Sequence, residues 1–192
     1  MTIASEAKLE RRAKARSATR AAILEAARRV ATREGARNLS LRAAAAEAGF
    51  APAALYGYFG NKDALLLALA ADDLGAIARA MRSAAGNNGV NSPLAAAAAA
   101  ALALLQHTET IVAASSALPP TAGAGKAERL FNGRLIAALN ALAHATGRNA
   151  ESRAAQNEVV LLAAALTGLA MFARSGRLAA LGFATDELVA RL

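Results

Sequence analysis

Residues 40–66, SLRAAAAEAGFAPAALYGYFGNKDALL, decide the fold of the N-terminal third of the chain. The opening serine is a good N-cap for a short helix over Leu41–Ala48, because its hydroxyl can accept a hydrogen bond from a first-turn amide. Gly49 ends that helix, and a second helix is expected over Pro52–Phe59, since proline suits a first helical position. Two short helices joined by a glycine turn predict a helix-turn-helix whose second helix enters the DNA major groove.

A longer helix is expected before this segment, to brace it. From about Thr19 apolar residues recur at helical spacing, and Gly35 is a candidate left-handed C-cap. Residues 1–18 are polar, basic and weakly patterned, and we interpret them as a flexible arm. The spacing predicts a small three-helix core made of Ile23, Val30, Leu41, Phe50 and Leu55.

The positive charge of the chain is concentrated at this end. The net charge is +8, and residues 1–62 hold twelve lysines and arginines against five acidic residues, an excess of seven. A basic N-terminal domain on a nearly neutral remainder is typical of a protein that binds a polyanion. A basic, solvated tail without a partner is the alternative that charge alone leaves open.

Composition predicts an all-α protein. Hydrophobic residues make up 56% of the chain, but aromatic residues only 4%. Alanine is abundant instead, and it is the strongest helix former. After the helix-turn-helix, Asn61 caps a helix that runs to about Ala85. Glycine- and proline-rich segments at 86–93 and 118–125 predict loops between the later helices. Those helices are expected at Pro93–Ser115, Lys126–Thr146, Ala150–Arg174 and Asp186–Leu192.

The helix-turn-helix segment and its flanks resemble a known family. Ile23–Ala27, Gly35, Ser40–Phe50 and the string LYGYFGNKDALL at residues 55–66 resemble the tetracycline-repressor (TetR) family of bacterial regulators. The resemblance covers roughly residues 19–66, about a quarter of the chain, and the string is its most specific part. It implies a DNA-binding domain at 19–66 and a helical effector-binding and dimerisation domain at 67–192.

The resemblance also implies roles for individual residues. Ser40 and Lys62 would contact phosphates, Tyr56 and Tyr58 would reach the DNA backbone or base edges, and Arg42 could add a phosphate contact. Tyr56 as a partly buried core residue and Arg42 as a solvated cation are the structural alternatives. The expected DNA-binding residues are Ser40, Arg42, Ala51, Pro52, Ala53, Ala54, Tyr56, Gly57, Tyr58 and Lys62.

The second helix of the motif departs from the family pattern. The family often has serine at the position of Ala51, and Ala53, Ala54 and Gly57 replace polar or larger groups. A surface with so few hydrogen-bonding side chains favours readout by the tyrosines, by methyl contacts with thymine and by DNA shape.

The family's C-terminal domain binds a small molecule and forms a homodimer. The expected dimer residues are Val159, Leu162, Leu166, Leu169 and Phe172, with an intramolecular core helix as the alternative. An effector cavity could be lined by Met81, Leu104, His107, Leu130, Arg134, Met171 and Phe172, although apolar residues of helices are core by default. The effector would be apolar or amphipathic.

Several classes of protein fit the sequence poorly. No catalytic constellation or phosphate-binding loop is visible, so we expect no enzyme and no cofactor. The chain has no cysteine, and two isolated histidines do not suggest a metal site. The longest apolar runs fall short of the roughly 20 residues that span a bilayer. We expect a cytoplasmic, homodimeric repressor that binds double-stranded DNA operators. A protein that docks on anionic membranes and an architectural DNA-binding protein without a ligand are the alternatives.

Overall fold

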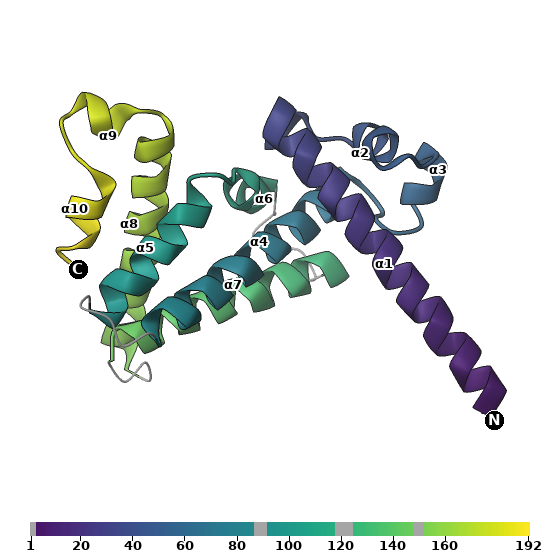
Figure 1. The fold of residues 1–192 in the computed structure, drawn as a ribbon, viewed down its shortest axis with the longest axis horizontal. Helices are drawn as coiled ribbons and strands as arrows, with labels where there is room; N and C mark the ends of the chain where they lie inside the picture. The colour runs from purple at the N-terminus through teal and green to yellow at the C-terminus, as the bar shows by residue number, and fades with distance from the viewer. Residues whose placement is uncertain (1–2, 87–91, 118–124, 148–151) are drawn as a thin grey trace.

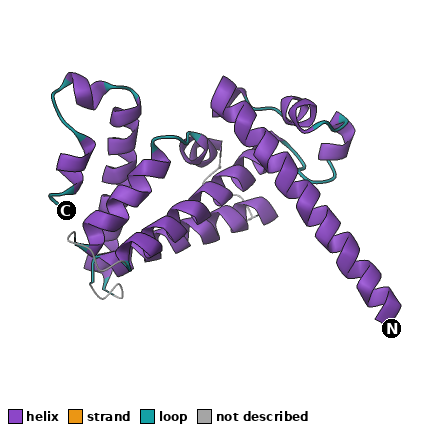
Figure 2. Ribbon diagram, viewed as in Figure 1, coloured by secondary structure: helices purple, strands orange, loops and turns teal. Residues whose placement is uncertain are grey.

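The computed structural model describes residues 3–86, 92–117, 125–147 and 152–192 (Figure 1). In these ranges all regular structure is helical, as composition predicts (Figure 2). The helices are α1 (Ile3–Glu34), the short 3-10 helix η1 (Ala36–Asn38), α2 (Leu41–Ala48), α3 (Pro52–Leu55), α4 (Lys62–Ala85), α5 (Pro93–Leu105), α6 (Thr110–Ala117), α7 (Lys126–Ala145), α8 (Arg153–Arg174), α9 (Arg177–Ala180) and α10 (Thr185–Val189).

We call residues 3–66 the head and the remaining described residues the body. In the head, α2 and α3 lie on one side of α1, and the N-terminal half of α1 projects beyond them (Figure 1). Four of the five predicted head-core residues are buried, namely Ile23, Val30, Leu41 and Leu55. The fifth, Phe50, is 37% exposed, because the glycine turn before it places its side chain at the edge of the three-helix core.

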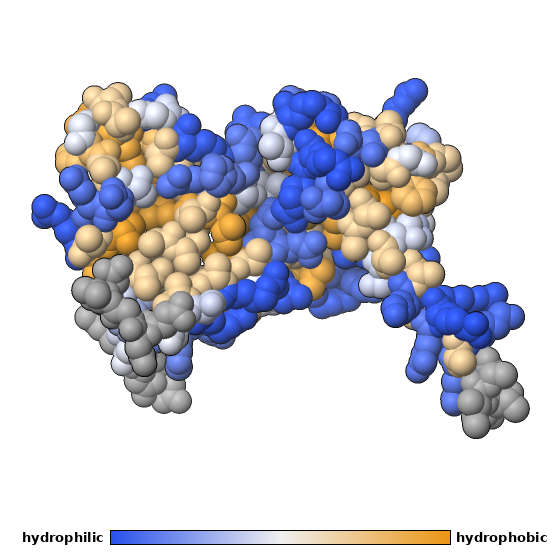
Figure 3. Space-filling model, in the orientation of Figure 1, coloured by the Kyte–Doolittle hydropathy of each residue, from blue (hydrophilic) through white to orange (hydrophobic). Residues whose placement is uncertain are grey.

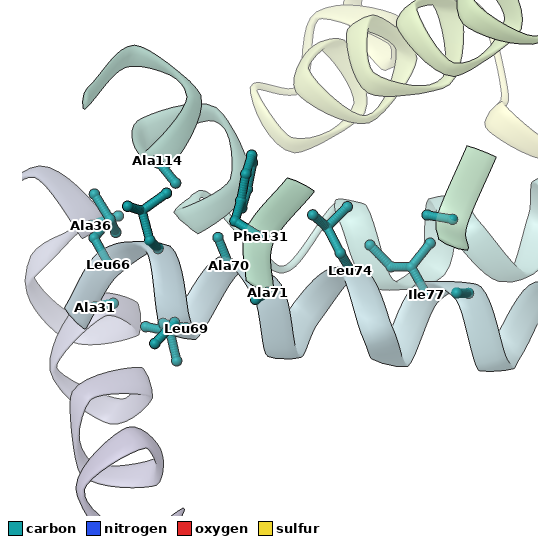
Figure 4. Close-up of a cluster of buried hydrophobic side chains, with 14 of the residues drawn as sticks. Ala31, Ala36, Leu66, Leu69, Ala70, Ala71, Leu74, Ile77, Ala114 and Phe131 are labelled. Atoms are coloured by element: carbon teal, nitrogen blue, oxygen red, sulfur yellow. The ribbon is translucent and has the colours of Figure 1, made fainter. Parts of the chain in front are cut away.

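Helix α4 belongs to both parts of the molecule. Its first turns complete the head, with Leu65 fully buried, and its later turns pack along α5, α6 and α7. Figure 4 shows this helix between Ala31 of α1, Ala114 of α6 and Phe131 of α7. An apolar residue on nearly every turn of α4 therefore ties the head to the body.

The body is a set of helices packed around α4. Helices α5 and α7 lie against α4, and α8 packs on α5 and α7 with one face (Figure 1). Small residues let these helices approach closely, since Ala97, Ala98 and Ala101 of α5 are buried. The short α9 and α10 return from α8 toward α5, which α10 contacts.

The first helix is longer than the sequence predicts. It begins at Ile3 instead of near Thr19, so the segment that we expected to be a flexible arm is helical. Alanine, glutamate, lysine and arginine dominate residues 4–18, and all four have high helix propensity. Once the helix near Thr19 is formed, each further residue added to it gains a backbone hydrogen bond. Residues 3–18 can therefore be helical although they have no apolar stripe to bury.

Other helix bounds also differ from the prediction. Helix α3 ends at Leu55 rather than Phe59, and the helix expected over Pro93–Ser115 is broken at residues 106–109. The last helix is α10, shorter than the predicted Asp186–Leu192. The interiors of both predicted loops, and residues 150 and 151 of the helix predicted over Ala150–Arg174, lie outside the described residues.

The contact of α4 with its neighbours gives a stability prediction. Leu69 is fully buried, so Leu69→Ala is expected to lower the free energy of unfolding by about 2–5 kcal/mol, through lost burial and the cavity left behind. Chemical denaturation measures this change. Leu9→Ala is the control: that leucine is 53% exposed on α1, and an equal loss there would contradict the packing described.

Candidate nucleic-acid interface

The start of α2 has the predicted cap. Ser40 is extended, and its Oγ accepts a hydrogen bond from the Ala43 amide at 3.0 Å. At the other end, Gly49 adopts the left-handed conformation with φ of 72°, which the helix-turn-helix needs. Arg42 is exposed on the first turn of α2, so its charge is available to a polyanion.

Helix α3 presents a small, apolar surface to solvent. Ala51, Pro52, Ala53 and Ala54 are all exposed, while Leu55 anchors the helix in the head core. Ala51 occupies the N-cap position and forms no side-chain cap, as the missing hydroxyl implies. The first-turn amides of α3 therefore have no side-chain cap from Ala51.

A turn follows α3 and carries the two tyrosines. Tyr56 is 60% exposed, which disfavours its alternative role in the core, and Gly57 beside it is also exposed. Tyr58 is half-buried and its ring lies under the guanidinium of Arg16, 4.9 Å from the ring centroid. Phe59 is buried. The turn thus offers one free phenol and one phenol held against α1.

Lys62 joins the two ends of the predicted interface. It is exposed at the start of α4, and its Nζ donates a hydrogen bond to the Arg37 carbonyl at 2.6 Å. Asn61 caps the same helix by accepting from the Ala64 amide at 2.7 Å. The ammonium group is therefore placed beside the backbone that leads into Ser40.

The sequence reasoning missed the part that α1 plays at this surface. Arg16 donates through Nη2 to the Gly57 carbonyl at 2.6 Å, and the Arg20 guanidinium lies 5.1 Å from the centroid of the Phe59 ring. Both arginines thus fix α1 against the turn that carries the tyrosines. Their spacing of four residues was the available signal, since such residues share one face of a helix.

An ion-pair cluster joins α1 to α2 on the head. Arg29 Nε and Arg33 Nη1 donate to the two carboxylate oxygens of Glu47 at 2.7 and 3.1 Å. These hydrogen bonds, first that of Arg29 and then that of Arg33, lower the pKa of Glu47. Since a lowered carboxyl pKa favours the folded head at neutral pH, this contribution is lost as the pH falls through the pKa of Glu47.

Comparison with known proteins agrees with this geometry. Residues 23–69 match the family model described as bacterial regulatory proteins, tetR family. A TetR-family regulator from Streptomyces coelicolor A3 is 27% identical, over 90% of this chain and 88% of that one, with a TM-score of 0.52. The N-terminal domain of this chain is thus a DNA-binding domain of the TetR family. The chain is a DNA-binding transcriptional regulator.

Two further solved structures share the fold of this chain. A protein of unknown function from Rhodococcus sp. RHA1 is 25% identical, over 89% of each chain, with a TM-score of 0.69. FadR from Bacillus subtilis, solved in complex with stearoyl-CoA, is 18% identical over 88% of this chain and 92% of that one, with a TM-score of 0.59. No curated protein sequence matches significantly.

A buried polar cluster connects the head to the body. The Asp73 carboxylate on α4 is 7% exposed and pairs with Arg28 of α1. It also accepts hydrogen bonds from the hydroxyls of Thr108, at 2.9 Å, and Thr110. The cluster spans α1, α4 and the break between α5 and α6. The sequence signal for this cluster, which the sequence reasoning did not use, is Asp73, an acidic residue on the apolar face of α4.

The seven predicted effector residues are not brought together. Met81 is buried in the core, Leu104 and Phe172 are 38% and 51% exposed, and Arg134 lies beside Gly75 of α4. The other three line separate hollows. Leu130 lines one of about 930 Å³ between α1 and α7, and His107 lines a cleft of about 510 Å³ around the Asp73 cluster. Met171 lines a hollow of about 450 Å³ enclosed by η1, the start of α4, α6 and the end of α8.

Four of the five predicted dimer residues lie on the face of α8 that packs against the body. Val159 and Leu166 are buried inside the chain, and Leu162 and Leu169 are half-buried against the core, so the intramolecular alternative holds for them. Phe172 is the exception, at 51% exposed. The exposed side of α8 therefore differs from the side that holds most of the predicted dimer residues, because hydrophobicity surrounds this helix and sequence alone does not say which side the body covers.

The glycine turn of the helix-turn-helix can be tested directly. Gly49→Ala forces a Cβ into a left-handed residue, which costs about 1–2 kcal/mol, although the space around it is open. We therefore expect a lower thermal midpoint of unfolding. Gly60→Ala is the matched control, because its surroundings are also open and its φ is not positive. Equal midpoints for the two variants would show that the turn geometry is wrong.

Proposed function

We propose that the protein is a homodimeric repressor that places one α3 in each of two successive major grooves of an operator, in the cytoplasm. The observation that carries this proposal is the exposed alanine surface of α3, flanked by Arg42 and Lys62, in the segment that matches the family model. The functional division would fall near residue 66, with DNA contacts before it and effector and dimer contacts after it.

An exposed apolar face of α8 supports the second copy. Leu161 and Phe172 are 69% and 51% exposed, and Ala164 and Ala165 between them are exposed on the same side. Figure 3 shows hydrophobic colours over the part of the molecule that contains α5, α8 and α9, whereas the projecting end of α1 is mostly blue. A contiguous apolar patch of this kind is typical of an interface between proteins.

Helix α8 also has the length and composition of a membrane span, with a mean hydropathy of 1.4 over 18 residues, of which 17% are buried. We favour a protein partner. One side of α8 packs on the body through Val159, Leu166 and Ala170, and Arg174 at its end pairs with Glu109. A second α8 would cover the open side, with Gly168 allowing close approach because no atom lies within 4 Å of its Cβ position.

The Asp73 cluster is a physical route from effector to DNA. A small apolar or amphipathic molecule between α6 and α8 would contact Val112 and Met171 and displace α6. Thr108 and Thr110 bracket the start of α6 and bond Asp73, which holds Arg28 of the head. Displacing α6 would thereby change the position of the head. Only an effector that binds the two arrangements unequally would alter DNA affinity. Stearoyl-CoA, the ligand of the B. subtilis FadR structure, is one amphipathic probe of this kind.

The DNA-binding proposal is tested at Lys62. We expect Lys62→Ala to weaken binding to duplex DNA of any sequence, and to reduce the slope of log K against log salt by about 0.9 per subunit, the value for one phosphate contact. Fluorescence anisotropy at several salt concentrations measures both. Arg177→Ala, which removes an exposed cation from α9, is the control. An unchanged slope for Lys62→Ala would refute the assignment of this surface.

The dimer proposal is tested on α8. Leu161→Glu places a charge on the open apolar face, and we expect monomers in sedimentation at micromolar concentration where the unaltered protein is dimeric. Ile136→Glu is the control, because Ile136 is 57% exposed on a different helix, α7. If the unaltered protein sediments as a monomer, or if Leu161→Glu leaves the dimer intact, the interface is not on this face.

A further inference from the structure

The N-terminal half of α1 forms a second charged surface beside the helix-turn-helix. Helix α1 has 32 residues, which makes it about 48 Å long, and its first half leaves the head as a single projecting helix (Figure 1). Residues 8–18 are all exposed, so this segment has no part in the core. Packing therefore does not determine which side chains this segment carries, and its charge pattern can be examined for a binding role.

Four cations form a row along one side of this helix, apart from Arg11 and Lys14, which lie off it. Lys8, Arg12, Arg16 and Arg20 are spaced by four residues, which turns each about 40° from the one before. We call these four residues the basic ridge. Glu6 and Glu10 each lie two residues from a member of the ridge, about 200° around the helix, and so on its opposite side.

The inner end of the basic ridge is fixed to the predicted DNA surface. Arg16 bonds the Gly57 carbonyl and covers the Tyr58 ring, and Arg20 covers the Phe59 ring. Gly57 and Tyr58 belong to the turn that directly follows α3. These contacts set the rotation of α1 about its axis, so Lys8 and Arg12 continue outward on the side where that turn lies.

The basic ridge costs the isolated helix some stability. Like charges four residues apart destabilise a helix by roughly 0.2–0.5 kcal/mol for each pair, and the acids on the far side do not relieve this. A row of phosphates would turn the repulsion into attraction. A row of regularly spaced cations on a rigid helix can pair with successive phosphates of a DNA backbone. Arms that enter the minor groove are extended chains instead, so this helix favours contact with the backbone.

We propose that the basic ridge binds the phosphate backbone of duplex DNA outside the half-site occupied by α3, with Lys8 and Arg12 making the outer contacts. This proposal rests on the DNA-binding function proposed above and lengthens the contact beyond the helix-turn-helix. The outer contacts depend on the helix as well as on the charges, because a disordered segment with the same cations would hold no fixed row.

Two charge-matched double variants test the proposal. Lys8→Gln with Arg12→Gln removes two members of the basic ridge, and Arg11→Gln with Lys14→Gln removes two exposed cations that lie off it. All four side chains are exposed, so folding should be unaffected. With a duplex that extends at least one turn beyond the site, we expect the ridge variant to reduce the salt slope by about 1.8 per subunit, at 0.9 per phosphate contact, and the control to change it much less.

A third variant separates the helix from its charges. Ala13→Pro keeps every cation and breaks the helix between Arg12 and Arg16, because proline lacks the amide hydrogen and clashes with the preceding turn. We expect it to lose the same part of the salt slope as the ridge variant. Equal losses for the two charge-matched variants, or a full slope with Ala13→Pro, would overturn the proposal. Neither result would affect the assignment of Lys62, which is tested independently.

Discussion

The structure depends on one helix that is packed at both ends. Leu65 at the start of α4 closes the head core, and Leu69, Leu74 and Ile77 further along form the centre of the body. Because one continuous helix carries both sets of contacts, it is expected to transmit a tilt of its body portion to the head. Such a helix is required if a ligand bound to the body is to change the DNA affinity of the head, because two sites are coupled only through an element whose position both of them affect.

The Asp73 cluster adds a polar contact to this apolar axis. A buried carboxylate is tolerated only where it is paired and hydrogen-bonded, and Asp73 takes its partners from α1 and from the start of α6. An apolar contact would tolerate sliding of α6 over α4, whereas these bonds have direction and favour one arrangement. The cluster thus distinguishes one position of α6 from others, which makes the break between α5 and α6 more than a loop between two helices.

The sequence was most informative where local rules apply. Capping by Ser40 and Asn61, the end of α2 at Gly49 and the burial of Leu55 follow from short-range chemistry, and all were predicted. It was least informative where a choice depends on distant packing. The phase of α8 could not be derived, because alanine and leucine surround that helix and only α5 and α7 decide which side is covered. Likewise, the effector-site residues were chosen mainly for hydrophobicity. Most of them lie in separate places, because hydrophobic side chains are used mainly to pack the core and their presence does not identify the lining of a cavity.

Entry of α3 from each subunit into the major groove, as a symmetric pair, is the step on which the proposed function depends. Protection of guanine N7 from methylation measures major-groove contact directly, on a duplex selected from random sequence by the unaltered protein. We expect two protected patches on one face of the duplex, about 10 base pairs or a multiple of that apart, because two recognition helices are related by a two-fold axis. A single protected patch, or binding that leaves every guanine N7 accessible, would contradict the proposed function.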